Sequence, residues 1–442
     1  MRIIGFFSRF LAFSFVFVLF QNENDTNAET LKNAIEKAYK VSETIEIKRN
    51  QADFGKINRD TAILNFIPTL TMNYQYNYKQ IKNSQSYADP SMVMMMQQQN
   101  GEKKTFEGSH MASISMRSSL SFWKTLPGVY VAWKGMTAKE YEYNDFLENF
   151  GLLFIQKYMD VIYNEKSLEV YKQMSETLEK KVKKVQVMKQ YGSAKNDKVV
   201  LAEAQYYKNK ADEIQTKSNL DKTKMDYKIM TGEDPIDLTI PDVSNAKLPA
   251  KNKDDFVALV LAQNSKLKQT RDEMISQKNY MIIQSFDMLP ELYSELSYAY
   301  YKIPNMMTYN GAYMGIGVSW TINGSNNRFA NFRKEYKTYR IANLNYSLTL
   351  KQIEQDAGYA WEQYFAMLEL VKATEKALKA STDSLKEVKV SVATGTATFI
   401  DEMDVENQYL EANLNYLNAQ KALILSYYKM ISMTGVGKLP VM

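Results

Sequence analysis

The sequence contains no cysteine and only one histidine, and these two shortages exclude several kinds of site. Without cysteine there is no disulfide, no thiolate metal ligand, no cysteine nucleophile and no N-terminal cysteine for lipid attachment. Because His110 is the only imidazole, the chain cannot build a histidine-based triad or a histidine metal cluster. Hydrolase and phosphate-loop motifs are missing as well. We therefore expect a protein that is not an enzyme and has no cofactor and no metal site.

Dense basic blocks and long apolar runs are also scarce. The 442 residues carry a formal net charge of +5, which gives no support to nucleic-acid binding. Residues 11–20 are apolar, follow Arg2 and Arg9, and lead into a polar stretch, a pattern typical of a secretory signal peptide. We expect residues 1–28 to be that signal, with an N-terminal anchor as the alternative. No later stretch approaches the ~20 apolar residues of a transmembrane helix, so we expect an exported chain without helical spans.

The chain contains an internal repeat. Residues 192–232 align with residues 395–435 without a gap, and glycines match at both ends. Farther upstream, residues 65–78 align with residues 287–300, again without a gap and with a proline in common. Chance similarity between two helical segments does not explain prolines and glycines that recur in the same order. We infer a duplication of roughly 200 residues.

The duplication predicts the organisation of the chain. We expect a first repeat at 29–232, a polar and proline-containing linker at 233–253, and a second repeat at 254–442. Each repeat reads as a helix of roughly 35 residues, a proline, two strands, a very long helix, a glycine turn and another helix of roughly 35 residues. At about 1.5 Å per residue the long helix near 127–190 measures about 95 Å, and two shorter helices end to end measure about 105 Å. The expected object is a rod.

The closing helix carries two apolar stripes rather than one. Both have the alternating three- and four-residue spacing of a coiled-coil seam, which favours a neighbouring helix on each side. A single wide amphipathic face is the alternative. The first stripe is Met403, Leu410, Leu414, Leu417 and Ile424; the second is Val405, Tyr409, Ala412, Tyr416, Ala419, Leu423 and Met430.

The segments that follow Pro68 and Pro290 alternate sharply between apolar and polar residues. Each predicted strand has roughly 10 to 12 residues, which is the length that crosses an outer membrane when tilted. An ordinary half-buried sheet is the alternative. Four strands cannot close a membrane barrel, so membrane strands would require several chains. We expect the prolines to mark the strand entries and interfacial aromatics to lie at Tyr74, Tyr76, Tyr298 and Trp320.

These features together resemble the outer-membrane efflux protein family, the TolC-like channels. The resemblance rests on the duplicated order of elements and on the motif Gly-Thr-x-Thr-x-x-Asp-x-x-Asp at residues 395–404, and it covers essentially the whole mature chain. It implies a mostly α fold with a small β part: a long α-helical barrel plus four membrane β-barrel strands per chain, closed by trimerisation. It also implies an outer-membrane location reaching into the periplasm.

The family resemblance implies a function and partners too. The expected function is an export duct of a tripartite efflux pump or a type I secretion system, passive and coupled to an inner-membrane transporter through a periplasmic adaptor protein. The expected partners are two further copies in a homotrimer, the adaptor, the transporter and outer-membrane lipid. The exported substrate stays open. A periplasmic structural coiled-coil protein without channel activity is the competing hypothesis.

Within that resemblance, the repeated glycine segments are the tips of two helical hairpins. Gly192, Ser193, Gly395 and Thr396 are expected to form the turns and to contact the adaptor.

Asp401 and Asp404 match aspartates that line the narrow periplasmic end of the duct in the family. The alternative is that both are carboxylates favoured by the start of a helix. Ala397 stands where the family can have an arginine.

The methionine-rich stretch at 92–99 invites comparison with a soft-metal site, but its position between two strands favours an extracellular loop.

Overall fold

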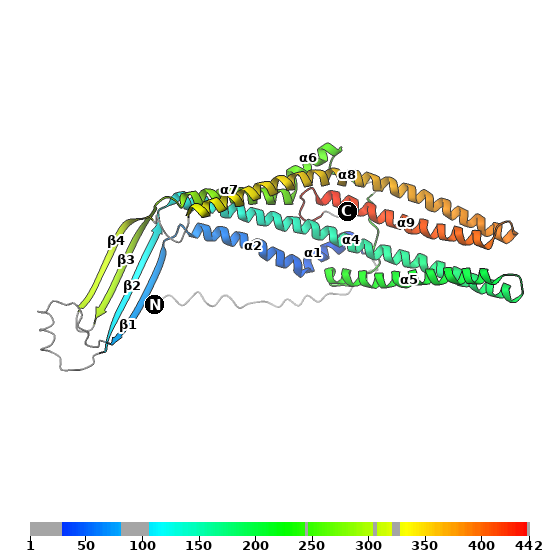
Figure 1. Cartoon of the computed structure of the whole chain (residues 1–442), viewed down its shortest axis with the longest axis horizontal. Helices are drawn as coiled ribbons and strands as arrows, with labels where there is room; N and C mark the ends of the chain where they lie inside the picture. The colour runs from blue at the N-terminus through cyan, green and yellow to red at the C-terminus, as the bar shows by residue number, and fades with distance from the viewer. Residues whose placement is uncertain (1–28, 81–105, 244–245, 304–306, 321–327, 440–442) are drawn as a thin grey trace.

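The computed structural model shows an elongated molecule with a sheet at one end and two helical hairpins at the other (Figure 1). The predicted signal peptide and the methionine-rich stretch lie outside the described residues. The structure describes residues 29–80, 106–243, 246–303, 307–320 and 328–439.

Both halves of the chain have the same order of elements. The first half contains α1 (Leu31–Val41), α2 (Glu43–Leu64), β1 (Thr69–Gln80), β2 (Phe106–Ser119), α4 (Phe122–Gln190) and α5 (Asn196–Thr231). The second half contains α6 (Lys253–Gln263), α7 (Ser265–Phe286), β3 (Glu291–Ile303), β4 (Met307–Ser319), α8 (Arg328–Thr394) and α9 (Phe399–Ser432). The mostly helical fold with four strands is therefore confirmed, while the boundaries of the repeats and the linker stay a prediction.

The predicted helix before each proline is in fact two helices, so that expectation was wrong. The breaks fall at Ser42 and Asn264, whose backbones are extended with ψ of 113° and 127°. At the second break the Asn264 side chain accepts a hydrogen bond from the N–H of Leu267 at 3.0 Å, which caps α7. Its amide nitrogen donates to the carbonyl of Met433 at 3.2 Å. The break is therefore fixed by a distant segment as well as by local capping.

The two longest helices run nearly the whole length of the helical region. α4 has 69 residues and α8 has 67, so each measures about 100 Å at about 1.5 Å per residue. α4 ends where expected but begins at Phe122, and Pro127 lies in its second turn, where the missing N–H removes only one hydrogen bond. Figure 1 shows α2 and α5 one after the other beside α4, and α7 and α9 one after the other beside α8.

The helices form one layer in a fixed order. α4 packs against α2 and α5 on one side and against α7 and α9 on the other, and α8 packs against α7 and α9. The order across the layer is therefore α2 with α5, then α4, then α7 with α9, then α8. Because α9 contacts both α8 and α4, the expectation of two neighbouring helices is confirmed, while the assignment of one stripe to each neighbour stays a prediction.

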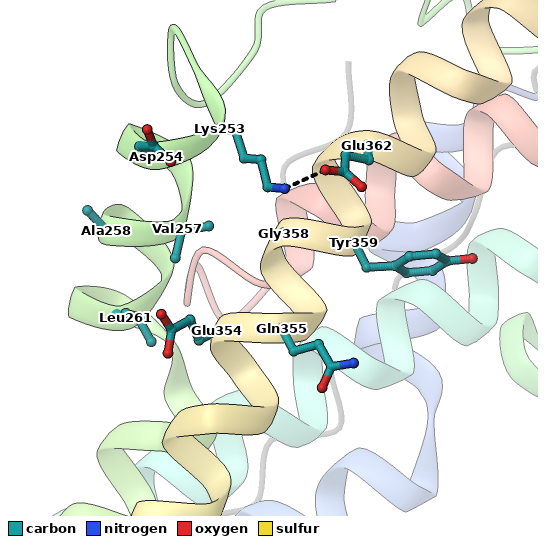
Figure 2. Close-up of a pocket in the computed structure, with 10 residues that line it drawn as sticks. All are labelled: Lys253, Asp254, Val257, Ala258, Leu261, Glu354, Gln355, Gly358, Tyr359 and Glu362. Atoms are coloured by element: carbon teal, nitrogen blue, oxygen red, sulfur yellow. Dashed lines mark hydrogen bonds and ion pairs between the residues drawn. The ribbon is translucent and has the colours of Figure 1, made fainter.

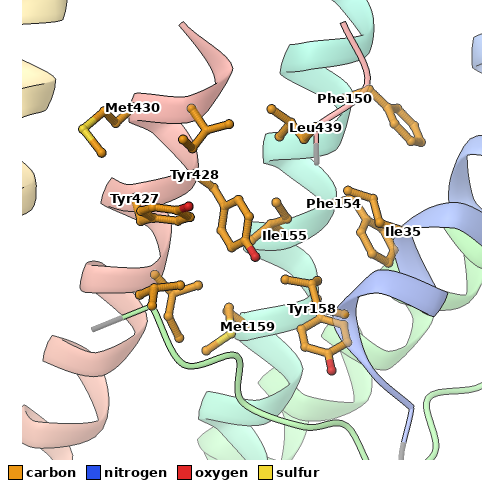
Figure 3. Packing of buried hydrophobic residues seen from close by; sticks show 14 of the residues in the cluster. Ile35, Phe150, Phe154, Ile155, Tyr158, Met159, Tyr427, Tyr428, Met430 and Leu439 are labelled. Atoms are coloured by element: carbon orange, nitrogen blue, oxygen red, sulfur yellow. The ribbon is translucent and has the colours of Figure 1, made fainter. Parts of the chain in front are cut away.

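The core lies at the middle of the rod, where the helix pairs meet end to end. Figure 3 shows buried side chains from α1, α4, α9 and the C-terminal segment, including Phe154, Tyr158 and Tyr428. Three tyrosine hydroxyls donate to carbonyls of the segment between α5 and α6. Tyr158 bonds Thr239 at 2.8 Å, Tyr364 bonds Val243 at 3.2 Å and Tyr427 bonds Lys247 at 3.4 Å. These bonds satisfy backbone groups that burial would otherwise leave unpaired.

Candidate functional site

The first hairpin turns between α4 and α5. Gly192 has φ +74°, a left-handed conformation that favours glycine, and its N–H donates to the carbonyl of Lys189 at 3.0 Å. The N–H of Ser193 reaches back to the carbonyl of Met188 at 2.8 Å, which closes the last turn of α4. Tyr191, Gly192 and Ser193 are exposed. The two residues expected in this turn are thus at its apex.

The second hairpin turns between α8 and α9 with matching geometry. Gly395 has φ +76°. Thr396 donates from its N–H and from its hydroxyl to the carbonyl of Ser391, at 2.9 and 3.1 Å. No side chain or backbone lies within 4 Å of a Cβ built on either tip glycine, so only the backbone conformation explains the glycines. That both tips contact an adaptor stays a prediction.

Asp401 and Asp404 lie in the first turns of α9, and their surroundings differ. Asp401 completes a capping box with Thr398: the N–H and hydroxyl of Thr398 donate to the Asp401 carboxylate, each at 2.7 Å. These bonds hold the pKa of Asp401 below its usual value. Asp404 is exposed and, among the residues that the structure describes, forms no hydrogen bond or ion pair. Asp401 thus serves the helix start, while the role of Asp404 at a constriction stays a prediction.

The two hairpins are joined by a buried cluster of charges that sequence reasoning did not find. Lys181 of α4 pairs with Glu402 and Glu406 of α9, at 2.9 and 2.7 Å, and its ammonium lies 5.6 Å from the ring centroid of Phe399. The side chain of Glu406 is 1% exposed, and burial raises its pKa although Lys181 opposes the shift. The cluster holds the start of α9 against α4 near the tips.

The strands begin directly after the two prolines. Pro68 and Pro290 immediately precede β1 and β3, where a residue without an N–H costs the sheet nothing. β4 ends at Ser319, so Trp320 follows the strand instead of lying within it as expected; its Nε1 donates to the carbonyl of Met288 at 3.2 Å.

The sheet is antiparallel in the order β1-β2-β3-β4, and its register gathers the predicted apolar sets onto one face. Directly paired residues share a face, so the four strands form rows. Three of the rows are Leu70, Met116, Leu296 and Met314; Met72, Ile114, Tyr298 and Ala312; and Tyr74, Ala112, Tyr300 and Asn310. Apart from the half-buried Tyr300, the large apolar side chains of these rows are exposed; Met314, for example, is 84% exposed. A continuous, uncovered apolar face of this size marks an interaction surface.

The opposite face is polar and contains tyrosines that lie over glycines. Asn73, Ser113 and Ala299 are paired across three strands, and Gly311 completes their row. Gly317 pairs with Tyr293, whose ring occupies the space that a Cβ would need. Tyr309 and Tyr313 cover Gly311 and Gly315 in the same way. This close approach of rings explains the glycines of β4.

A groove of about 590 Å³ lies between α6 and α8, where Lys253 forms an ion pair with Glu362 and Tyr359 points away from α6 (Figure 2). The described part of the chain has no group of three or more side chains able to hold a metal ion. No helix in the described ranges has both the length and the apolar character needed to cross a membrane.

No protein-family model and no curated protein sequence matches the chain, but solved structures match it over nearly its whole length. The outer membrane channel CmeC of Campylobacter jejuni matches with a TM-score of 0.79 at 14% identity, covering 94% of this chain and 87% of that chain. This chain has the fold of the outer-membrane channels. The outer membrane protein VceC of Vibrio cholerae gives 0.75 at 15% identity, covering 92% and 96%, and the open state of the MtrE outer membrane channel of Neisseria gonorrhoeae gives 0.75 at 14%, covering 92% and 89%.

Proposed function

We propose that the chain is one subunit of an outer-membrane export channel, a passive duct whose wall several copies build together. The observation that carries the proposal is that the helical layer and the sheet are both open at their two outer edges. The channel fold supports it, because the matched structures are described as outer membrane channels or as an outer membrane protein. The proposal includes the outer-membrane location and excludes enzymatic chemistry.

The open edges of the sheet and of the helical layer coincide. β1 follows α2, and β4 leads to α8, so α2 and β1 lie at one side of the molecule and β4 and α8 at the other. In the described residues, β1 pairs only with β2 and β4 pairs only with β3. Unpaired strand edges cannot face lipid, because their N–H and C=O groups would lack partners. A second copy would satisfy both edges at once.

The helices at the two outer edges of the layer, α5 on one side and α8 on the other, carry apolar stripes that no described residue covers. The stripe on α5 follows the helical period, and Ile229 is 80% exposed. The stripe on α8 does the same over about five turns. The exposed residues are Val200, Tyr207, Ile214, Met225 and Ile229 on α5, and Ile341, Leu344, Leu348 and Tyr359 on α8. These stripes fit an interface in which α8 of one copy packs against α2 and α5 of the next.

Such an interface joins two different surfaces, and repeated copies form a closed ring when the rotation between neighbours closes after a whole number of copies. Membrane barrels need about eight strands or more, which four strands per chain supply only as a multimer. Three copies, the number in the family that the sequence resembles, would give a twelve-stranded barrel. The competing hypothesis of a structural rod leaves the uncovered apolar face of the sheet without a purpose.

The partners follow from the length of the molecule. The hairpin tips lie at the end opposite the sheet (Figure 1), about 100 Å from it by the length of α4. With the sheet in the outer membrane, the hairpin tips would reach deep into the periplasm. They are exposed there; Tyr191 of the first tip, for example, is 81% exposed. A periplasmic adaptor and an inner-membrane transporter would meet the duct there. Drug efflux and type I secretion remain equally compatible with this geometry.

Assembly into a membrane-inserted oligomer tests the proposal. We expect the detergent-extracted protein to be a uniform multimer by mass measurement and to form ion-conducting channels in planar bilayers. Leu296→Arg, on the apolar face near the middle of β3, should prevent membrane assembly, because a charge there would face lipid. Ser297→Arg, one residue away on the polar face, is the matched control and should assemble. A monodisperse, non-conducting monomer would contradict the proposal.

The acidic pair of the second tip should make the resting duct select cations. Residues three apart on a helix share a face, and fixed charges in a narrow pore are poorly screened. Asp401→Ala combined with Asp404→Ala should weaken both cation preference and block by multivalent cations in single-channel recordings. Asp401→Ala alone should mainly destabilise the start of α9, because it removes the capping box with Thr398. An unchanged preference in the double variant would make both residues helix-start residues only.

A further inference from the structure

Near the end of the sheet remote from the helices, the apolar face contains a row that carries positive charge. At the end of the strands remote from the helices, Tyr76 pairs with His110, His110 with Lys302, and Lys302 with Thr308. The pairing places all four residues on the face that carries the apolar rows. Two side chains able to hold a positive charge therefore stand next to each other at one edge of an otherwise uncharged surface.

No acidic residue shares this face in the described part of the strands. The glutamates of β3, Glu291 and Glu295, lie on the opposite face, in register with Ser319 and Gly315. Within the described ranges Lys302 forms no ion pair and is exposed. An unneutralised lysine beside an apolar surface is suited to an anionic partner.

The imidazole of His110 is held in one orientation. The Tyr74 hydroxyl lies 2.8 Å from Nδ1, and the Tyr76 ring centroid lies 4.8 Å from the imidazole centroid. With Nδ1 engaged, Nε2 bonds to no described residue. A histidine oriented in this way can donate a hydrogen bond to an anion through Nε2, and the neighbouring ammonium supplies the charge.

The height of this row matches the boundary of a membrane. Leu292, paired with Val318, lies at the helix end of the apolar face, and Lys302 lies ten positions farther along β3. At about 3.3 Å per residue and a tilt of about 40°, ten residues rise about 25 Å, which is the height of the apolar band of membrane barrels. Tyr74 and Tyr300 lie just below, where an aromatic girdle is expected.

We propose that His110 and Lys302 bind phosphate-bearing anionic lipid headgroups of the outer leaflet, one site on each chain. The proposal rests on the outer-membrane channel function proposed above, and it names a lipid class that this protein would select. The acyl chains would lie against the apolar rows, and a phosphate would accept from the Lys302 ammonium and from His110 Nε2. Neighbouring tyrosines would lie at the depth of the headgroups, where they stabilise the position of the strands in the membrane.

Lipid binding to the purified oligomer tests this site. Native mass spectrometry would count lipid A with two phosphates bound to the oligomer, against phosphatidylethanolamine as a lipid without net charge. We expect the parent protein to prefer the phosphorylated lipid. His110→Ala with Lys302→Ala should weaken that binding at least about five-fold, in line with the contribution of a cation at a membrane surface. Lys302→Arg should retain it, and Lys217→Ala, which removes an exposed lysine from α5, should leave it unchanged.

The outcomes separate this site from the channel itself. Equal retention of lipid A by the parent and the double variant would overturn the site, as would equal binding of phosphatidylethanolamine by the parent. Conductance measured on the same samples identifies the cause: conducting oligomers without lipid preference refute the site alone. A protein that neither oligomerises nor conducts refutes the proposed function and this site with it.

Discussion

Replacing Lys181 with alanine should destabilise the protein by about 3–5 kcal/mol at neutral pH, because the change leaves a buried charge without its partner. Lys181 is only 11% exposed and is shared by Glu402 and Glu406, which are 13% and 1% exposed. Without the ammonium, two carboxylates remain close together in a poorly solvated site. Urea unfolding of the purified protein measures the loss, as a fall in the transition midpoint.

A matched control lies two residues away on the same helix. Lys183 pairs with Glu179 at 2.6 Å, but the two side chains are 69% and 49% exposed. Lys183→Ala should therefore cost much less than Lys181→Ala, because water screens an exposed pair on one helix. The loss in the Lys181 variant should also shrink in acid, where Glu406, whose pKa burial raises, takes up a proton. Equal, small losses at both lysines would contradict the structural role of the cluster.

The position of this cluster matters for the tips. Glu402 and Glu406 lie in the first two turns of α9, directly after the second hairpin turn. Lys181 lies nine positions before the end of α4, which places it about 14 Å from the first hairpin turn. The cluster therefore fixes the spacing between the two tips of one chain, and in the proposed ring it would help to set the width of the narrow end.

The sequence predicted those features that depend on local chemistry. Glycine at a left-handed turn is a local requirement, and Gly192 and Gly395 adopt positive φ as expected. Proline is confined to strand starts for a local reason too, and Pro68 and Pro290 stand there. Strand faces follow from a period of two, which a single strand reveals.

Features that depend on distant contacts could not be predicted in the same way. The break at Asn264 is held by the hydrogen bond from its side-chain amide to the carbonyl of Met433. It is also held by the close packing of Gly435 against the backbone of Gln263, where a side chain on residue 435 would not fit. The sequence did contain one signal for this break, because asparagine is a favoured N-cap residue. The helical periodicity continues on both sides of Asn264, so the sequence was interpreted as one uninterrupted helix. Lys181 is one of several lysines in a short run, and nothing local indicates that Glu406, 225 positions away, will bury it.

A second large effect should appear on titration of Glu148, a carboxylate of α4 buried where three segments meet. Its Oε1 accepts hydrogen bonds from the Ser265 hydroxyl and from the N–H of Gly437, each at 2.8 Å. Only 3% of the residue is exposed. Glu148 thereby ties the C-terminal segment and the start of α7 to the long helix.

Burial raises the pKa of Glu148 from 4.5 to about 7. The two hydrogen bonds and the charge of Lys268 on α7 oppose the shift, while Asp145 on the same helix adds to it. The Tyr39 hydroxyl of α1 faces the same site, and burial together with this carboxylate raises its own pKa to about 12. None of the neighbouring groups offsets the cost of desolvating the carboxylate.

The direction of the pH effect follows from that raised value. Between pH 4.5 and about 7 the folded protein retains a proton that the unfolded chain has lost. Folding stability therefore falls as the pH rises through this window, by about 3 kcal/mol from this one group, and is level above it. Glu148→Gln removes the titration, and its amide oxygen can still accept both hydrogen bonds. The variant should thus gain about 3 kcal/mol over the parent as the pH rises from about 4 to about 8.

Urea unfolding across this range, with Glu176→Gln as an exposed control on the same helix, measures the difference directly. The control removes an exposed carboxylate that water solvates, so its unfolding curves should lie close to those of the parent. The comparison between the two variants cancels the titration of every other group. If the Glu148 variant also ran parallel to the parent across the whole range, the buried carboxylate would titrate at its ordinary pKa. The junction would then have to admit enough water to solvate the charge, contrary to its burial beneath Ser265 and the C-terminal segment.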